Sequence, residues 1–162
     1  MPSDHVRKAA EQLAARKWTV AFAESASAGR AAAEFALTEQ SGAILIGGII
    51  CYDATIKEKV LAISADMIKK YTPESREVTD ALAYALGGII EADIHVAITG
   101  LTTPGGSEST EKPVGTMFVT IAHNKGAIAL QQIFKGSSED IILQMIDLVA
   151  KNLTAMAMSE KF

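Results

Sequence analysis

Three short segments of the 162-residue chain carry the hydroxyl, amine and glycine groups that catalytic and binding sites use. The first segment, 23–29 (AESASAG), contains Ser25 and Ser27. A serine hydroxyl becomes a nucleophile when a base lies beside it and backbone N–H groups at a helix start receive the oxyanion. The alternative is that Ser25 or Ser27 only caps the following helix, which is the more common role of serine in such a turn.

The second segment, 52–57 (YDATIK), places Tyr52 and Lys57 directly after an apolar run. Lys57 can act as a general base if burial lowers its pKa from about 10.4 to near 8, which costs about 3 kcal/mol. The alternative is a solvated helix lysine, like the nearby Lys59.

The third segment, 99–106 (TGLTTPGG), combines glycines with three threonines. Glycines let a ligand approach the backbone closely, and the threonines supply hydroxyl groups. Lys112 follows and can pair with an anionic ligand. A ligand-binding loop and an ordinary surface loop are both consistent with this composition.

The other reactive residue types indicate neither a metal nor a cofactor. Cys51 is the only cysteine, so no internal disulfide and no cysteine metal cage can form. His5, His95 and His123 are scattered and lack a metal-ligand spacing. Cys51 and His95 lie in apolar runs, where a structural role is expected.

The composition predicts one globular domain over residues 1–162, with 49% hydrophobic and 21% charged residues. The net charge of −4 argues against a protein whose main partner is nucleic acid. No apolar run is long enough to cross a bilayer, and no targeting segment is recognisable at the N-terminus. We therefore expect a cytoplasmic protein without a membrane partner.

Helical and strand patterns alternate along the chain, which predicts an α/β layer structure. Helices are expected at 4–16, 27–38, 54–61, 64–71, 74–91 and 138–158, and strands at 19–23, 44–52, 94–99, 114–122 and 127–134. Strands separated by helices predict parallel pairs, and a hairpin signal at 124–126 predicts an antiparallel portion, so the sheet should be mixed. Each of the three segments follows a buried strand and should reach the same sheet edge.

The last helix carries an apolar stripe that continues to its end. This stripe includes Leu153, Met156 and Met158. It is more apolar than a closing helix needs, which predicts self-association through this surface.

In their order and spacing, the three segments resemble the CinA C-terminal domain family, whose stand-alone members include nicotinamide-nucleotide amidases. The family pattern AESxTGG is similar to 23–29, and GGxxxYxxxxK matches Gly47, Gly48, Tyr52 and Lys57. The pattern TGxxGPxGG…EKPVGT matches 99–106 and 111–116. The resemblance covers roughly residues 5–155.

The resemblance implies a three-layer α/β/α sandwich with a mixed, mostly parallel sheet. It also implies hydrolysis of nicotinamide mononucleotide, or a related amide, to the acid and ammonia. Ser25 would attack the carboxamide, Lys57 would serve as base with assistance from Tyr52, and the helix start after Ser25 would supply oxyanion donors. The implied substrate-binding residues are Glu24, Ser27, Gly29, Thr99, Gly100, Thr102, Thr103, Gly105 and Lys112. A homodimer or higher homo-oligomer is also implied, with no metal.

The sequence departs from the family pattern at positions that matter for function. Ala26-Ser27-Ala28 replaces Cys-Thr-Gly, and Thr103 replaces a glycine. The family's Gly-Asp-Arg and its second arginine correspond to 136–138 (GSS) and Ile142. Losing two guanidinium contacts to phosphate could cost on the order of 2–4 kcal/mol in binding. Three hypotheses therefore stay open: a pyridine-nucleotide amidase, an amidase for a less phosphorylated substrate, and a catalytically weak member that binds a small ligand or protein partner.

Overall fold

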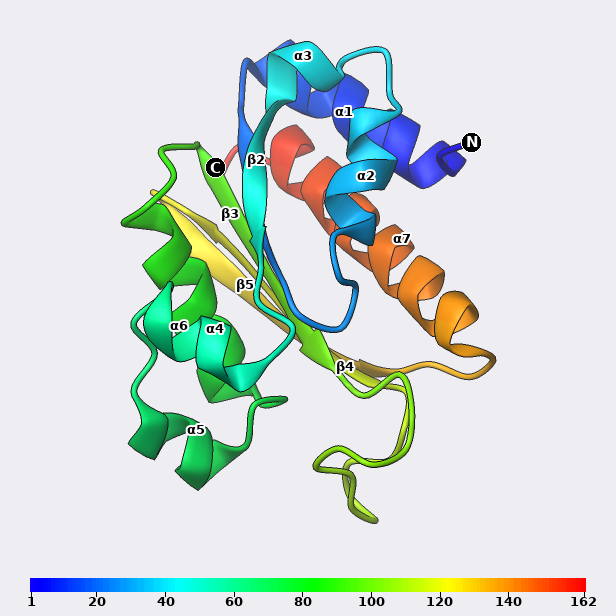
Figure 1. Cartoon of the computed structure of the whole chain (residues 1–162). Helices are drawn as coiled ribbons and strands as arrows, with labels where there is room; N and C mark the ends of the chain where they lie inside the picture. Colours follow the sequence, from blue (N-terminus) through cyan, green and yellow to red (C-terminus); the bar gives the residue numbers. More distant parts are fainter.

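The computed structural model describes residues 1–162 and shows one five-stranded sheet between two helical layers (Figure 1). The strands are β1 (Val20–Glu24), β2 (Leu45–Ile50), β3 (Ile94–Gly100), β4 (Thr116–His123) and β5 (Gly126–Ile133). The helices are α1 (Asp4–Arg16), α2 (Arg30–Ala36), α3 (Ser41–Ile44), α4 (Ala54–Lys59), α5 (Ala65–Tyr71), α6 (Arg76–Gly87) and α7 (Ser138–Met158). The predicted three-layer α/β/α arrangement is confirmed.

The sheet has the strand order β2-β1-β3-β4-β5. β1 pairs in parallel with both β2 and β3, whereas β3–β4 and β4–β5 are antiparallel. β4 is therefore the one strand that runs opposite to the other four, which confirms a mixed and mostly parallel sheet. At the end of β1, Glu24 is level with Ile50 of β2 and Ile98 of β3, so three strand ends share one edge.

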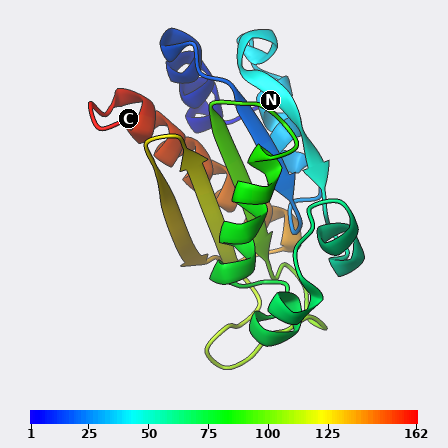
Figure 2. The same cartoon turned by 90° about the vertical axis from the view of Figure 1, so that its left-hand side faces the viewer.

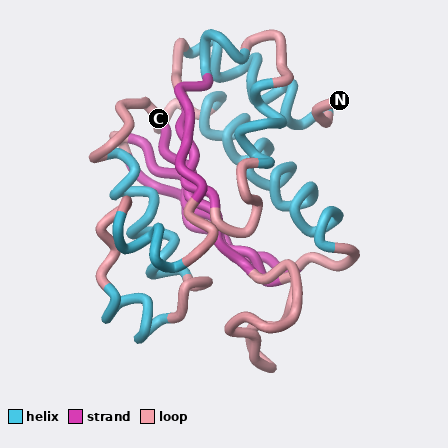
Figure 3. The backbone as a smooth tube through the Cα atoms, viewed as in Figure 1, coloured by secondary structure: helices cyan, strands magenta, loops and turns pink.

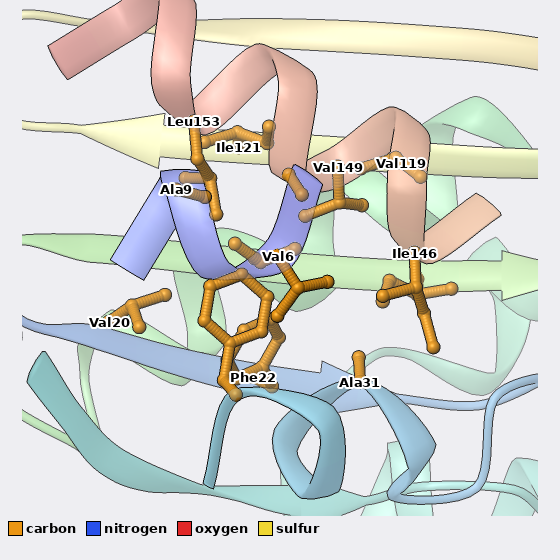
Figure 4. Close-up of a cluster of buried hydrophobic side chains, with 14 of the residues drawn as sticks. Val6, Ala9, Val20, Phe22, Ala31, Val119, Ile121, Ile146, Val149 and Leu153 are labelled. Atoms are coloured by element: carbon orange, nitrogen blue, oxygen red, sulfur yellow. The ribbon is translucent and has the colours of Figure 1, made fainter. Parts of the chain in front are cut away.

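Each face of the sheet is covered by its own helices. Side chains alternate along β1, so Val20 and Phe22 face one layer while Ala21 and Ala23 face the other. The first layer contains α1, α2 and α7, and its apolar cluster is shown in Figure 4. The second contains α4, α5 and α6 (Figure 2). β1 is buried along its whole length because it is central and covered on both faces.

α7 uses its apolar stripe inside the domain. Leu153 and Met156 are fully buried among α1 and the sheet, and Met158 is exposed. The prediction that this stripe forms an association surface is therefore wrong for Leu153 and Met156; self-association itself stays a prediction. By length and composition α7 could span a membrane, but it packs here as a core helix against α1.

The helix expected at 27–38 begins three residues later, at Arg30. Ala28 and Gly29 adopt the left-handed backbone conformation, with φ of 49° and 93°, which α-helical residues cannot have. The residues between β1 and α2 therefore form a turn, and this turn carries Ser25 and Ser27.

Candidate functional site

The turn between β1 and α2 is organised by the buried carboxylate of Glu24. Its Oε2 accepts hydrogen bonds from the N–H groups of Gly29 and Ala31, both at 3.0 Å, and its Oε1 accepts one from Ala32 at 2.8 Å. The unpaired N–H groups at a helix start favour a negative charge in this place. Glu24 thus occupies donors of the helix start that the sequence analysis had assigned to an oxyanion.

Two other donors in the turn remain unoccupied. The backbone N–H groups of Ala26 and Ser27 have no hydrogen-bond partner, whereas those of Ser25 and Ala28 donate to carbonyl groups. The Ser27 hydroxyl is also buried without a partner. The two free N–H groups directly follow Ser25 in the chain and are the backbone donors of this turn that remain available for an oxyanion.

The structure brings Lys57 against Ser25. Lys57 is 1% exposed, and its Nζ lies 2.9 Å from the Ser25 Oγ. The same Nζ lies 2.6 Å from the carbonyl oxygen of Cys51 and 3.3 Å from that of Tyr52. α4 can present Lys57 in this way because Asp53 caps its start, accepting a hydrogen bond from the Thr55 N–H. The expected approach of Ser25 and Lys57 at the sheet edge is confirmed.

The buried position of Lys57 raises the share of neutral amine at a given pH relative to a solvated lysine. Burial lowers the pKa of Lys57, and the nearby carboxylates of Glu74 and Asp53 oppose this only in part. A neutral amine has two N–H groups and one lone pair. In the structure the Nζ donates to the Ser25 hydroxyl and to both carbonyls. In the neutral amine the two N–H groups can stay with the carbonyls of Cys51 and Tyr52 while the lone pair accepts the Ser25 hydroxyl. Burial raises the pKa of the Cys51 thiol, consistent with a structural residue.

A cavity of about 230 Å³ opens beside Ser25. Ser25, Ala26 and Tyr52 line one side, Glu74 another, and the loop 100–106 the rest. The predicted binding residues Gly100, Thr102, Thr103 and Gly105 all lie in this loop. In Figure 3 the β3–β4 loop extends from the end of the sheet.

Tyr52 lies at the cavity without a bond to the reactive pair. Its side chain is 63% exposed, and only its backbone carbonyl contacts Lys57. The hydroxyl of Tyr52 has no hydrogen-bond partner within the protein, so the proposed assistance by this residue needs a bound ligand.

Two predicted binding residues point elsewhere. Thr99 is fully buried, and its Oγ1 lies 2.8 Å from the Oγ1 of Thr79 on α6. Lys112 is outside the cavity lining: its Nζ donates to Thr72 Oγ1, to the Glu74 backbone oxygen and to Ser107 Oγ, at 2.7, 2.8 and 2.7 Å. Lys112 therefore fastens its own loop to the segment before α6.

The positions where the family resemblance places arginines also have structural contacts. The Ser138 hydroxyl donates to the carbonyl oxygen of Thr102 at 3.0 Å. Ile142 packs against the main core cluster. Ser138, at the start of α7, thus contacts the cavity loop through a hydrogen bond, and neither position carries a guanidinium group.

Glu74 is the one charged residue in the cavity lining, and it is not among the site residues predicted from the sequence. Glu74 lies directly before Ser75, the N-cap of α6, and far in sequence from the three segments. No motif in its neighbourhood indicates a binding residue. Only the packing of α6 on the sheet brings it to Ser25.

Comparison with known proteins agrees with this fold. The family model described as the CinA C-terminal domain matches residues 3–157. A CinA-like protein of Prochlorococcus marinus is 34% identical over 122 residues, covering 75% of this chain and 29% of that protein. A CinA-like protein of Thermotoga maritima is 30% identical over 138 residues, covering 85% and 33%. The chain thus spans about a third or less of these curated relatives.

Solved structures extend the similarity to nearly the whole chain. A CinA superfamily protein of Klebsiella pneumoniae has a TM-score of 0.89 at 23% identity, covering 95% of this chain and 96% of that one. The competence/damage inducible protein CihA of Agrobacterium tumefaciens has a TM-score of 0.88 at 22% identity, covering 96% and 98%. At these identities the likeness concerns the fold.

Proposed function

The chain belongs to the CinA C-terminal domain family, and from that premise we propose that it is an amidohydrolase that cleaves a carboxamide with Ser25 and Lys57. The observation that carries the proposal is the 2.9 Å separation of Ser25 Oγ from the Nζ of a buried lysine. Nicotinamide mononucleotide, or a related pyridine amide, is the candidate substrate. The products are the corresponding acid and ammonia.

The acylation step begins with neutral Lys57. Its lone pair takes the proton of the Ser25 hydroxyl while Oγ attacks the carboxamide carbon. The free N–H groups of Ala26 and Ser27 are the donors available for the oxyanion. The C–N bond then breaks, the protonated Lys57 gives its proton to the leaving nitrogen, and ammonia departs from an ester on Ser25.

The second half-reaction uses the same groups. Lys57, neutral again, takes a proton from a water molecule that attacks the ester carbonyl. The Ser25–acyl bond breaks, Ser25 Oγ recovers the proton from Lys57, and the carboxylic acid leaves. One water is consumed and one ammonia released in each cycle.

Ammonia release by the purified protein from nicotinamide mononucleotide or a related pyridine amide tests this proposal. Ser25→Ala should abolish release, whereas Ser27→Ala, a matched change in the same turn, should retain most of it. A serine-reactive phosphonate should add its mass to wild type and not to Ser25→Ala. Undiminished release by Ser25→Ala would exclude Ser25 as the nucleophile.

A second candidate function is ligand binding by a member with weak or no catalysis. The observation that favours it is the absence of any lysine or arginine side chain from the cavity lining, which leaves a substrate phosphate without a cationic partner. Saturable binding of amides without ammonia from any of them would support this function over hydrolysis.

A further inference from the structure

The cavity beside Ser25 carries an unusual charge for a nucleotide site. Glu74 is the only charged residue in its lining, and the charge is negative. Lys57 lies beneath Ser25, fully buried, with a pKa lowered by burial. Among the residues that line the cavity, a phosphate group would therefore meet a carboxylate and no cation, which disfavours an anionic ligand.

The Glu74 carboxylate is held in place and has one oxygen free. Its Oε2 accepts a hydrogen bond from the Ser107 hydroxyl at 2.5 Å, and its Oε1 accepts none within the protein. Lys112 is one hydroxyl away, bonded to Ser107 and to the Glu74 backbone oxygen, and makes no ion pair with the carboxylate. This network fixes the carboxylate at the cavity while one oxygen stays available to a ligand.

The cations of the neighbouring elements lie outside the cavity lining. Arg30, at the start of α2, pairs with Glu34 and Glu139 at 2.7 and 3.3 Å. Ser138 stands where the family resemblance places an arginine, and it donates its hydroxyl to the cavity loop. The residues that line the cavity therefore supply no cation for a phosphate dianion.

We propose that the site selects an unphosphorylated carboxamide that is neutral or cationic, and that Glu74 is the specificity-determining residue. This inference rests on the proposed function, because it assigns a substrate class to the same cavity. A pyridinium amide with a sugar and no phosphate has the matching chemistry. Its cationic ring is attracted by the carboxylate, and its hydroxyl groups can donate to the free Oε1.

The experiment measures binding apart from hydrolysis by using Ser25→Ala protein. Calorimetric titration with nicotinamide riboside and with nicotinamide mononucleotide should show at least tenfold tighter binding of the riboside. Adding Glu74→Gln, which retains a carbonyl acceptor for Ser107, should weaken riboside binding about tenfold and tighten nucleotide binding. Glu77→Gln, an exposed neighbour outside the cavity, is the matched control and should change neither.

Nucleotide binding as tight as riboside binding would overturn the inference. A Glu74→Gln effect equal for both ligands, or no binding of either, would overturn it as well. Hydrolysis is judged separately by ammonia release from wild type. Glu74-dependent riboside binding without ammonia would defeat the proposed hydrolysis and leave this inference standing. Equal turnover of both ligands, unchanged by Glu74→Gln, would support the proposed hydrolysis and overturn the inference about Glu74.

Discussion

The floor and the rim of the cavity each contain a lysine with three hydrogen-bond partners. The floor consists of the turn 24–29 with Lys57, and the rim of residues 72–75 with the loop 100–112. Burial lowers the pKa of Lys57 and of Lys112 alike. The Lys57 amine meets two carbonyls and the Ser25 hydroxyl, whereas the Lys112 amine meets one carbonyl and two hydroxyls.

The two lysines differ in the hydroxyl groups that they contact. Ser25 borders the cavity and is followed by free backbone donors, so a proton taken by Lys57 can drive chemistry. The partners of Lys112 lead onward to Glu74, so this lysine connects two segments of the rim. Two lysines with three hydrogen-bond partners each thus differ in their surroundings: Lys57 is fully buried beside Ser25, whereas Lys112 is half-buried and connects two segments of the rim.

Replacing each lysine by methionine should give the largest difference in kcat between a floor variant and a rim variant. Lys57→Met should reduce kcat by about 100- to 10,000-fold, because the general base is lost. Lys112→Met should leave kcat within a few-fold, because the base and nucleophile remain. Steady-state ammonia release measures both. Equal loss of kcat in the two variants would end the distinction.

The floor should also depend on the Glu24 carboxylate for stability. Glu24→Gln replaces one acceptor oxygen by an NH₂ group that faces backbone N–H donors. The expected loss is about 2–3 kcal/mol of unfolding free energy. Urea denaturation measures it, with the exposed Glu39→Gln as the control. A loss below that of the control would show that the three hydrogen bonds of Glu24 contribute little.

The pH dependence of activity should report the floor lysine. Only neutral Lys57 accepts the serine proton, so kcat/KM should rise with pH and level off above the lowered pKa of Lys57. The midpoint should lie below about 10.4, the usual pKa of lysine, with a slope of about tenfold per pH unit beneath it. Lys112→Met should retain this profile. Activity that falls with rising pH from neutrality would contradict a lysine base.

Removing a hydrogen bond within the rim should have the smallest effect on catalysis. Ser107→Ala removes the hydroxyl that joins Glu74 to Lys112, which should raise KM a few-fold and leave kcat nearly unchanged. Faster amide hydrogen exchange in the loop 100–112 should accompany the change. Ser109→Ala, which removes a hydroxyl that accepts only the Lys112 backbone N–H within the same loop, is a control for the loop itself. A kcat loss as large as that of Lys57→Met would place the rim in the catalytic machinery.

The sequence by itself was sufficient for most of the element order and for the meeting of Ser25 with Lys57, although it did not indicate the short helix α3 before β2. Alternating apolar runs and helix caps such as Ser64 are local signals, and each is visible in a few neighbouring residues. The ends of parallel strands share one sheet edge, so Ser25 and Lys57 could be expected to meet once their strands were identified. The start of the helix expected at 27–38 was predicted three residues too early, because the residue type of Ala28 does not indicate its left-handed conformation.

Tertiary structure alone decided the direction of side chains and the charge of the cavity. Thr99 has the same residue type as the cavity threonines, yet strand alternation turns it toward α6. Lys112 was predicted to pair with an anionic ligand, but its amine donates to the Glu74 backbone oxygen. Glu74 lines the cavity although its segment contains no motif. These outcomes depend on which helix covers which face of the sheet. That choice is settled by packing among residues far apart in the sequence, where local patterns carry no information.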